Sequence, residues 1–344
     1  MALGGAALRL LGFGLLLLLV GCASLPPGLP RPVSEAIPAS PETELGRIAA
    51  ASLSGPDASG FRLMSWSAQA LDTRMALARS AQRSLDLQYY VIHDDEVGRH
   101  LLRTVREAAL RGVRVRLLLD DLYTAGMDPL LLGLAATPNI ELRLFNPFPA
   151  ARGSLLGRFT ASLFDQYWNN EFVYPLAAVV RNDEGPELLQ RRFVELTSAQ
   201  RAPEPKPAPQ GAKDLLGYVS IAEEMRSAGK IALVLASAEA FVDAPEKVIN
   251  HKRSHLPGAA EEAPTVRSGL LIRSPKLAEA LLMLAELVKT EAAFRVRLSA
   301  DQSHLQWHST LEDRQQTLDD EPDTSIWQRG FLWLIGPFVP EALL

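Results

Sequence analysis

The residues best suited to chemistry in this sequence form two short acidic clusters. His93, Asp94 and Asp95 follow one apolar segment, and Asp120 and Asp121 follow the next. An imidazole beside carboxylates can move protons near neutral pH, and grouped carboxylates can hold a divalent cation. Aspartates also cap helices and line loops, and a bare Asp-Asp pair supplies few oxygens for a metal. We therefore expect no metal and no cofactor, and we assign no catalytic role to these five candidates.

The apolar pattern of the first half predicts alternating strands and helices. Residues 84–92 alternate between apolar and polar side chains, which is the two-residue period of a strand. The next segment has a helical period and ends at Gly112, and the apolar face of this helix is expected to consist of Val97, Leu101, Val105 and Ala109. Strands at residues 113–119 and 139–145 and a helix at residues 128–136 continue the pattern. This order is typical of the layered α/β class.

The order of strand, helix and strand also places the acidic clusters. It predicts a right-handed βαβ unit with parallel strands. The carboxyl ends of parallel strands meet at one edge of the sheet, where such sheets bind ligands. We therefore expect the cluster at residues 93–95 to lie beside the Asp120-Asp121 pair in a polar pocket.

The N-terminal segment indicates export and a lipid anchor. Residues 1–21 carry one positive charge, Arg9, and a short apolar run, which is the pattern of a secretory signal rather than of a membrane span. The Leu-Val-Gly-Cys sequence that ends at Cys22 resembles the bacterial lipobox, in which the cysteine is acylated. Cys22 is the only cysteine, so it forms no internal disulfide. The alternative is an ordinary signal peptide with an incidental cysteine.

Composition and charge narrow the class of protein. A chain of 344 residues, 47% of them hydrophobic, can bury a sizeable core in one or two domains. Removal of residues 1–21 takes away Arg9 and no acid, so the net charge changes from -5 to -6. This balance argues against a nucleic-acid partner. Residues 26–41 are rich in Pro and Ser, which favours a tether above the membrane.

Several segments resemble the phospholipase D superfamily, in particular its bacterial cardiolipin synthase branch. The longest is ARSAQRSLDLQYYVIHDDEVGRHLLRTVREAALRGVRVRLLLDD at residues 78–121. Shorter ones are NIELRLFNPF at residues 139–148, FDQYWNNEFVYPL at residues 164–176 and RSGLLIRSPKLAEALL at residues 267–282. The resemblance implies a layered α/β sandwich and an ancestry in phosphatidyl transfer between phospholipids.

The motif that carries the family's chemistry is missing. In the superfamily, two copies of H-x-K-x4-D supply a histidine that attacks phosphorus, a histidine that protonates the leaving alcohol, and lysines that stabilise the phosphoryl oxygens. None of the six histidines of this chain has a lysine two residues on. The resemblance skips the motif-bearing segments, which in relatives lie between the landmarks at residues 146–164 and 248–266. It therefore implies a truncated fold whose activity is impaired or lost.

These observations predict a domain order and a location. We expect a signal peptide at residues 1–21, a lipid-anchored tether at 22–60, a phospholipase D-like α/β region at 61–200, a Pro-rich linker at 201–213, and a second-domain remnant with the family tail at 214–344. The location expected is the periplasm-facing bacterial envelope. The residue after Cys22 is Ala23 rather than an aspartate, which favours the outer membrane over the inner one. The expected partner is membrane phospholipid.

Three alternatives stay open. The chain could perform phosphatidyl transfer, either through His93 and the neighbouring acids or by association with an intact homologue or a second copy. It could be a non-enzymatic interaction protein of the envelope. It could also be a decayed product that does not fold stably, because the loss of central strands exposes sheet edges.

Overall fold

A computed structural model describes residues 32–55, 58–124, 126–145, 168–169, 173–180, 182–242, 268–291, 293–299, 304–311, 314–320, 322 and 324–325. The predictions for the signal peptide, for Cys22 and for the two segments that lack the family motif lie outside these residues. Among the described residues, no helix is long and apolar enough to cross a membrane.

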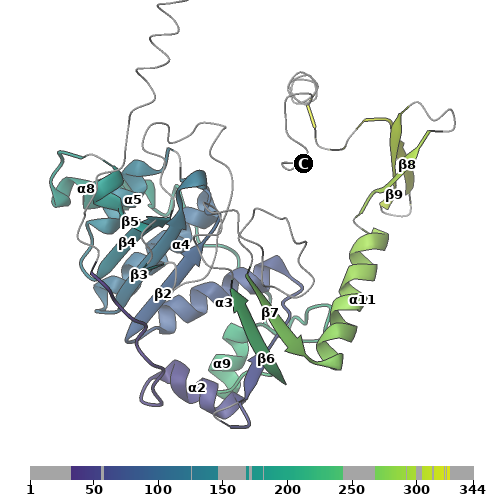
Figure 1. Cartoon of the computed structure of the whole chain (residues 1–344), viewed down its shortest axis with the longest axis horizontal. Helices are drawn as coiled ribbons and strands as arrows, with labels where there is room; N and C mark the ends of the chain where they lie inside the picture. The colour runs from purple at the N-terminus through teal and green to yellow at the C-terminus, as the bar shows by residue number, and fades with distance from the viewer. Residues whose placement is uncertain are drawn as a thin grey trace, which may run out of the picture.

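The first half of the chain forms a four-stranded sheet covered by helices (Figure 1). In spatial order the strands are β2 (Ser84–Tyr89), β3 (Arg114–Asp120), β4 (Ile140–Phe145) and β5 (Val173–Pro175). The first three are parallel, and β5 is antiparallel to β4. Helix α4 (Glu96–Leu110) connects β2 to β3, and α5 (Asp128–Ala135) connects β3 to β4. The predicted α/β class with parallel βαβ units is therefore confirmed, while the phospholipase D-like sandwich stays a prediction.

The sequence of helix α4 explains which of its faces is buried and where the helix ends. Its amphipathic pattern buries Leu101, Val105 and Ala109, as predicted. Val97 is 46% exposed, so its predicted place on the buried face is wrong. The inward position of the first turn is taken by Gly98 instead, because a Cβ there would stand 2.0 Å from the carbonyl oxygen of His93. Gly112, with φ +94°, ends the helix in a conformation that favours glycine.

The main hydrophobic core lies between this sheet and its helices. Side chains of β3, such as Val115 and Leu117, are fully buried there together with Leu131 of α5. Helix α8 (Pro186–Leu196) adds Phe193 to the same cluster. Burial of such side chains stabilises a domain by roughly 1.5–3 kcal/mol each.

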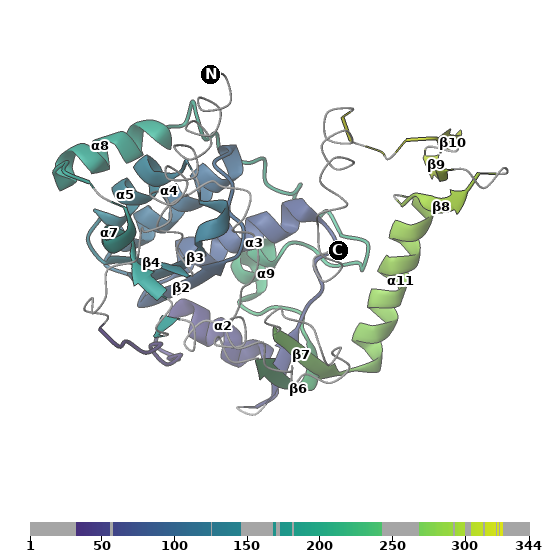
Figure 2. The same cartoon turned by 45° about the horizontal axis from the view of Figure 1, so that its top comes forward.

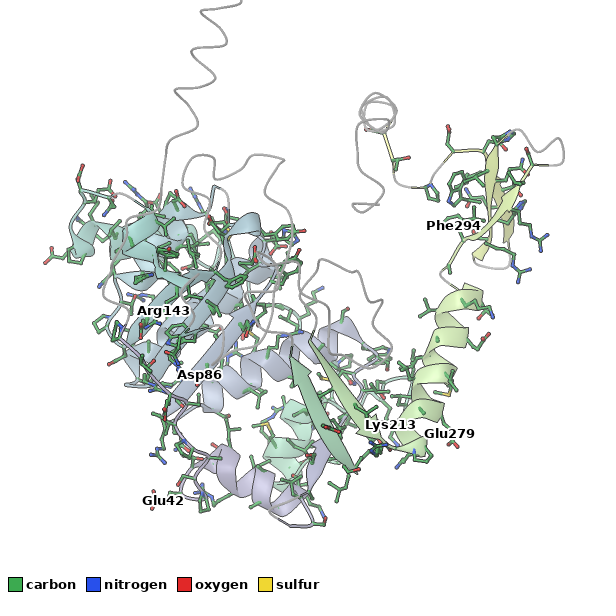
Figure 3. The ribbon with its side chains drawn as sticks, in the orientation of Figure 1. Glu42, Asp86, Arg143, Lys213, Glu279 and Phe294 are labelled. Atoms are coloured by element: carbon green, nitrogen blue, oxygen red, sulfur yellow. The ribbon has the colours of Figure 1, made fainter. Side chains whose placement is uncertain are left out.

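The other face of the sheet carries a buried polar cluster. Arg116 forms a two-pronged ion pair with Asp86, at 2.8 and 2.7 Å. The indole ring of Trp168 packs against two guanidinium groups, with Cζ of Arg116 5.2 Å and Cζ of Arg143 4.3 Å from its centroid. Arg143 also donates to the carbonyl oxygens of Trp168 and Pro32, both at 2.7 Å. Figure 3 shows Asp86 and Arg143 on this sheet, near the N-terminal segment that the cluster holds in place.

Part of the predicted tether is folded. Helix α2 (Glu44–Ser52) buries Ile48, and β1 (Ser59–Phe61) pairs antiparallel with β6 (Val234–Val242). The tether predicted at residues 22–60 is therefore wrong for this part, because long-range strand pairing and burial fix residues whose local composition favours a linker. The remaining domain boundaries stay predictions.

The other described elements are helices and two small sheets. Helix α3 (Ser67–Ser80) packs against α9 (Ile221–Ala228), and α7 (Leu176–Val179) follows β5. Strand β7 (Ser268–Arg273) pairs with β6 and leads into α11 (Pro275–Glu291). A separate antiparallel sheet follows, made of β8 (Arg295–Leu298), β9 (Leu305–Leu311) and β10 (Arg314–Leu318). Figures 1 and 2 show α11 and this sheet standing away from the rest of the molecule.

Candidate ligand site at the carboxyl edge of the sheet

The acidic clusters meet at one edge of the parallel sheet. Strands β2 and β3 are direct neighbours, with Tyr89 opposite Leu119. The residues that follow these two strands therefore lie at the same carboxyl edge, in the arrangement that the βαβ order predicted. Asp120 is the last residue of β3, and Asp121 begins a single 3-10 turn, Asp121–Tyr123.

The two aspartates after β2 have structural partners. Asp95 caps α4, because its Oδ1 accepts a hydrogen bond of 2.7 Å from the backbone N–H of Gly98. Asp94 accepts a hydrogen bond of 2.6 Å from Nε of Arg99, and this ion pair raises the pKa of the arginine. Both carboxylates are thus engaged in the local structure of the helix start.

The two aspartates after β3 are buried. Asp121 is 2% exposed, and its Oδ1 accepts a hydrogen bond of 2.7 Å from the hydroxyl of Thr124, which also donates to the backbone carbonyl of Asp121. Asp120 is 6% exposed. The contacts of Asp121 are typical of an aspartate that stabilises a tight turn. Among the described residues, no group of three or more His, Cys, Asp and Glu side chains is arranged to hold a metal ion.

His93 is exposed at this edge. Within the described part of the chain its imidazole makes no hydrogen bond, and the neighbouring Asp94 is paired with Arg99 instead. A histidine that serves as nucleophile or base normally needs a partner that orients its ring. The structure therefore does not assemble such a pair around His93.

Two tyrosines complete the edge. The rings of Tyr90 and Tyr123 pack edge to face, with centroids 5.3 Å apart and an interplanar angle of 78°. Burial raises the pKa of Tyr90 to about 12, helped by its hydrogen bond with Tyr123 and by the negative charge of Asp120. The phenol thus stays protonated and can donate a hydrogen bond at any physiological pH. Tyr90 is 41% exposed, so this amphipathic group faces solvent.

Sequence reasoning missed the role of Tyr123. The available signal was its spacing, because Tyr123 follows the Asp120-Asp121 pair within one turn and must lie at the same edge as the end of β2. Trp168 and Tyr89 also appear in aromatic-rich sequence, but Trp168 is fully buried and Tyr89 packs against the core. Only Tyr90 and Tyr123 among these aromatics lie at the candidate site.

Comparison with known proteins adds a local relationship. No family model matches the chain, and no solved structure matches it. Over 93 residues the chain is 48% identical to "Cardiolipin synthase C" of Escherichia coli K12, which is 27% of this chain and 20% of that protein. Over 109 residues it is 36% identical to an uncharacterized protein of Helicobacter pylori, 31% of this chain and 21% of that one. The chain thus matches about a fifth of the length of these curated relatives, and over that stretch it is related to a cardiolipin synthase.

Proposed function

We propose that this protein is a bacterial envelope lipoprotein of phospholipase D ancestry that binds phospholipid at the carboxyl edge and does not catalyse phosphatidyl transfer. The proposal rests on the contacts of the aspartates and of His93 at this edge. Asp94, Asp95 and Asp121 are engaged in local structure, and His93 has no partner to orient it among the described residues. The local identity to a cardiolipin synthase supports an ancestral site for phospholipid.

The missing motif supports the loss of catalysis. Transfer through a phosphohistidine needs one histidine to attack phosphorus and a second group to protonate the leaving alcohol. With no H-x-K-x4-D in the sequence, neither role has its expected residue. Binding has fewer requirements, because an exposed tyrosine such as Tyr90 offers an apolar ring and a hydroxyl that suit the apolar and polar parts of a lipid surface.

A paired assay tests both halves of the proposal. The purified chain, given phosphatidylglycerol or phosphatidylethanolamine vesicles, should co-sediment with them and yield no cardiolipin, phosphatidic acid or free head group. Tyr90→Ala should weaken co-sedimentation. Leu188→Ala on α8 is the matched control, because Leu188 has nearly the same exposure, 40%, and lies on another element. Vesicle binding that Tyr90→Ala leaves unchanged would contradict the proposed site.

The competing enzyme hypothesis has its own variant. If the chain turns over either lipid, His93→Ala shows whether His93 takes part. Turnover that this variant abolishes would replace our proposal with an active site built on His93. Turnover that it leaves intact would contradict our proposal and also exclude His93.

A second candidate, a non-enzymatic interaction protein, is favoured by one observation. Strand β7 and helix α11 expose several large apolar side chains, of which Leu270 is 59% exposed, Leu281 58% and Leu282 67%. Contiguous exposed apolar surface often marks an interaction site. A stoichiometric partner that Leu282→Glu releases would support this candidate, and a monomeric chain with no such partner would count against it.

A further inference from the structure

A cavity of about 630 Å³ shares no residue with the carboxyl-edge site. Its lining comes from α3, from α9 and from the Pro-rich segment at residues 204–207. Helices α3 and α9 pack against each other (Figures 1 and 2). Leu71 and Met75 of α3 and Met225 of α9 supply an apolar lining. The volume is in the range of small-molecule sites, which are mostly apolar with a few polar groups that orient the ligand.

The polar end of the cavity contains a buried histidine whose tautomer can be inferred. His100 is 2% exposed, and its Nδ1 lies 2.6 Å from Nη2 of Arg103. A guanidinium group only donates hydrogen bonds, so Nδ1 must be the acceptor. Burial, and then the charges of Arg103 and Arg79, lower the pKa of His100, so the ring is neutral at pH 7 and its proton lies on Nε2.

The Nε2–H of His100 therefore meets another donor. Its neighbour is Nη2 of Arg79, at 3.5 Å. Two donors cannot satisfy each other, whereas one oxygen acceptor that lies beside both nitrogens, at about 2.9 Å from each, would satisfy both. Both residues line the cavity, so such an acceptor can belong to a ligand.

The chain itself places a carboxylate against Arg79. Oε1 of Glu204 lies 2.6 Å from Nη2 of Arg79. The two side chains are 67% and 45% exposed, and exposed ion pairs of this kind contribute little stability. A ligand oxyanion with the same chemistry can therefore displace Glu204 from Arg79.

The other charged residues of the cavity restrict the charge that the ligand's head group can carry. Two cations, Lys206 and Arg226, and two acids, Glu44 and Asp72, also line the cavity. None of these four side chains forms an ion pair among the described residues. The cations attract an oxyanion, whereas the two acids disfavour a head group with two negative charges. A singly charged carboxylate or phosphodiester fits this balance better than a dianionic phosphate.

We propose that this cavity binds a single-chain amphiphile by its singly charged oxyanion, which accepts hydrogen bonds from His100 and Arg79 while the tail packs against Leu71, Met75 and Met225. Glu204 competes with the ligand for Arg79. The proposal goes beyond the lipid binding proposed at the carboxyl edge, because it concerns a different surface and a single-chain ligand.

Titration calorimetry on the purified chain tests the proposal with laurate below its critical micelle concentration. We expect saturable binding at one site, weakened about tenfold by Arg79→Gln through loss of a charge-assisted hydrogen bond and tightened by Glu204→Gln. Arg192→Gln is the matched control, because Arg192 lies on α8, away from the cavity, and carries a similarly exposed guanidinium that is paired with Glu184. Absent binding, or equal binding by Arg79→Gln and Arg192→Gln, would overturn the proposal.

Further ligands separate the head group from the tail. Affinity should rise from acetate to octanoate to laurate, by up to roughly fourfold for each methylene buried. If lysophosphatidylglycerol monomers compete with laurate, the site accepts phosphodiester head groups as well as carboxylates. If they do not compete, the site binds single-chain carboxylates alone, which is still the proposed class of ligand. Inorganic phosphate that binds as tightly as laurate, or a dodecyl ammonium ion that does so, would overturn it. Tyr90→Ala should leave laurate binding unchanged, which separates this test from that of the carboxyl-edge site.

Discussion

The roles of His100 and of the aspartates at the carboxyl edge follow from their hydrogen-bond donors and acceptors. The aspartates at the carboxyl edge looked like candidates for chemistry because they follow parallel strands, yet their bonds are those of a helix cap, an ion pair and a turn. His100 received no role from the sequence, although Arg103 three residues later lies on a neighbouring face of the same helix. Burial is the main cause of the lowered pKa of His100, and the sequence spacing of His100 and Arg103 does not reveal how deeply the ring is buried.

The lowered pKa of His100 predicts a pH dependence of stability. The unfolded chain takes up a proton near pH 6.5, whereas the folded chain takes it up only at lower pH. The stabilising effect of the neutral ring is therefore fully present above pH 6.5 and falls as the pH drops toward the folded-state pKa. Urea unfolding at pH 7.5 and 5.5 should show a larger loss of free energy on acidification for the wild type than for His100→Gln. Equal losses would contradict the inferred protonation state.

The N-terminal cap of helix α4 leads to a second prediction. Asp95→Ala removes the acceptor for the N–H of Gly98 and should lower the free energy of unfolding by about 1 kcal/mol. Asp183→Ala, at an exposed position with no hydrogen bond within the described residues, is the control and should change it by less than about 0.5 kcal/mol. If the two variants are equally stable in urea unfolding, Asp95 is not a structural cap and its carboxylate regains interest as a functional group.

The polar face of the sheet makes a third prediction. Asp86→Ala leaves the guanidinium of Arg116, whose side chain is 1% exposed, without its two-pronged partner. Breaking a buried pair in this way should cost about 3 kcal/mol or more. The double variant Asp86→Leu/Arg116→Met should cost less, because it removes both charges together. A double variant as unstable as the single one would show that packing around Trp168, rather than charge, dominates this face.

The elements also show how far the sequence could predict the fold. The periods of residues 84–145 predicted β2, α4, β3, α5 and β4 with small errors at their ends, because each element is amphipathic or buried along its whole length. β2 ends at Tyr89 rather than at residue 92. Helix α2 and strand β1 were missed, since β1 is three residues long and is fixed by pairing with β6, about 175 residues later. The cavity was missed for the same reason, because its walls come from segments far apart in the chain.

The whole molecule combines a well-packed α/β region, to which α8 adds Phe193, with a C-terminal part, α11 and the β8–β10 sheet, that stands away from it (Figures 1 and 2). The α/β region completely buries apolar side chains of α4, α5 and β3, whereas β7 and α11 expose large apolar side chains. This division agrees with the proposal that the chain keeps an ancestral phospholipid-binding half without the segments that carry the family's chemistry. The local identity to a cardiolipin synthase covers about a quarter of the chain and gives that proposal its direction.

If this chain cannot form a phosphohistidine intermediate, an attempt to trap that intermediate should leave the protein unlabelled. The purified chain is incubated with phosphatidylglycerol radiolabelled in its phosphate, quenched in alkali to preserve phosphohistidine, and separated from lipid by gel electrophoresis. We predict that no label stays on the protein, although vesicles still bind. Label covalently attached to any histidine of this chain would contradict the account.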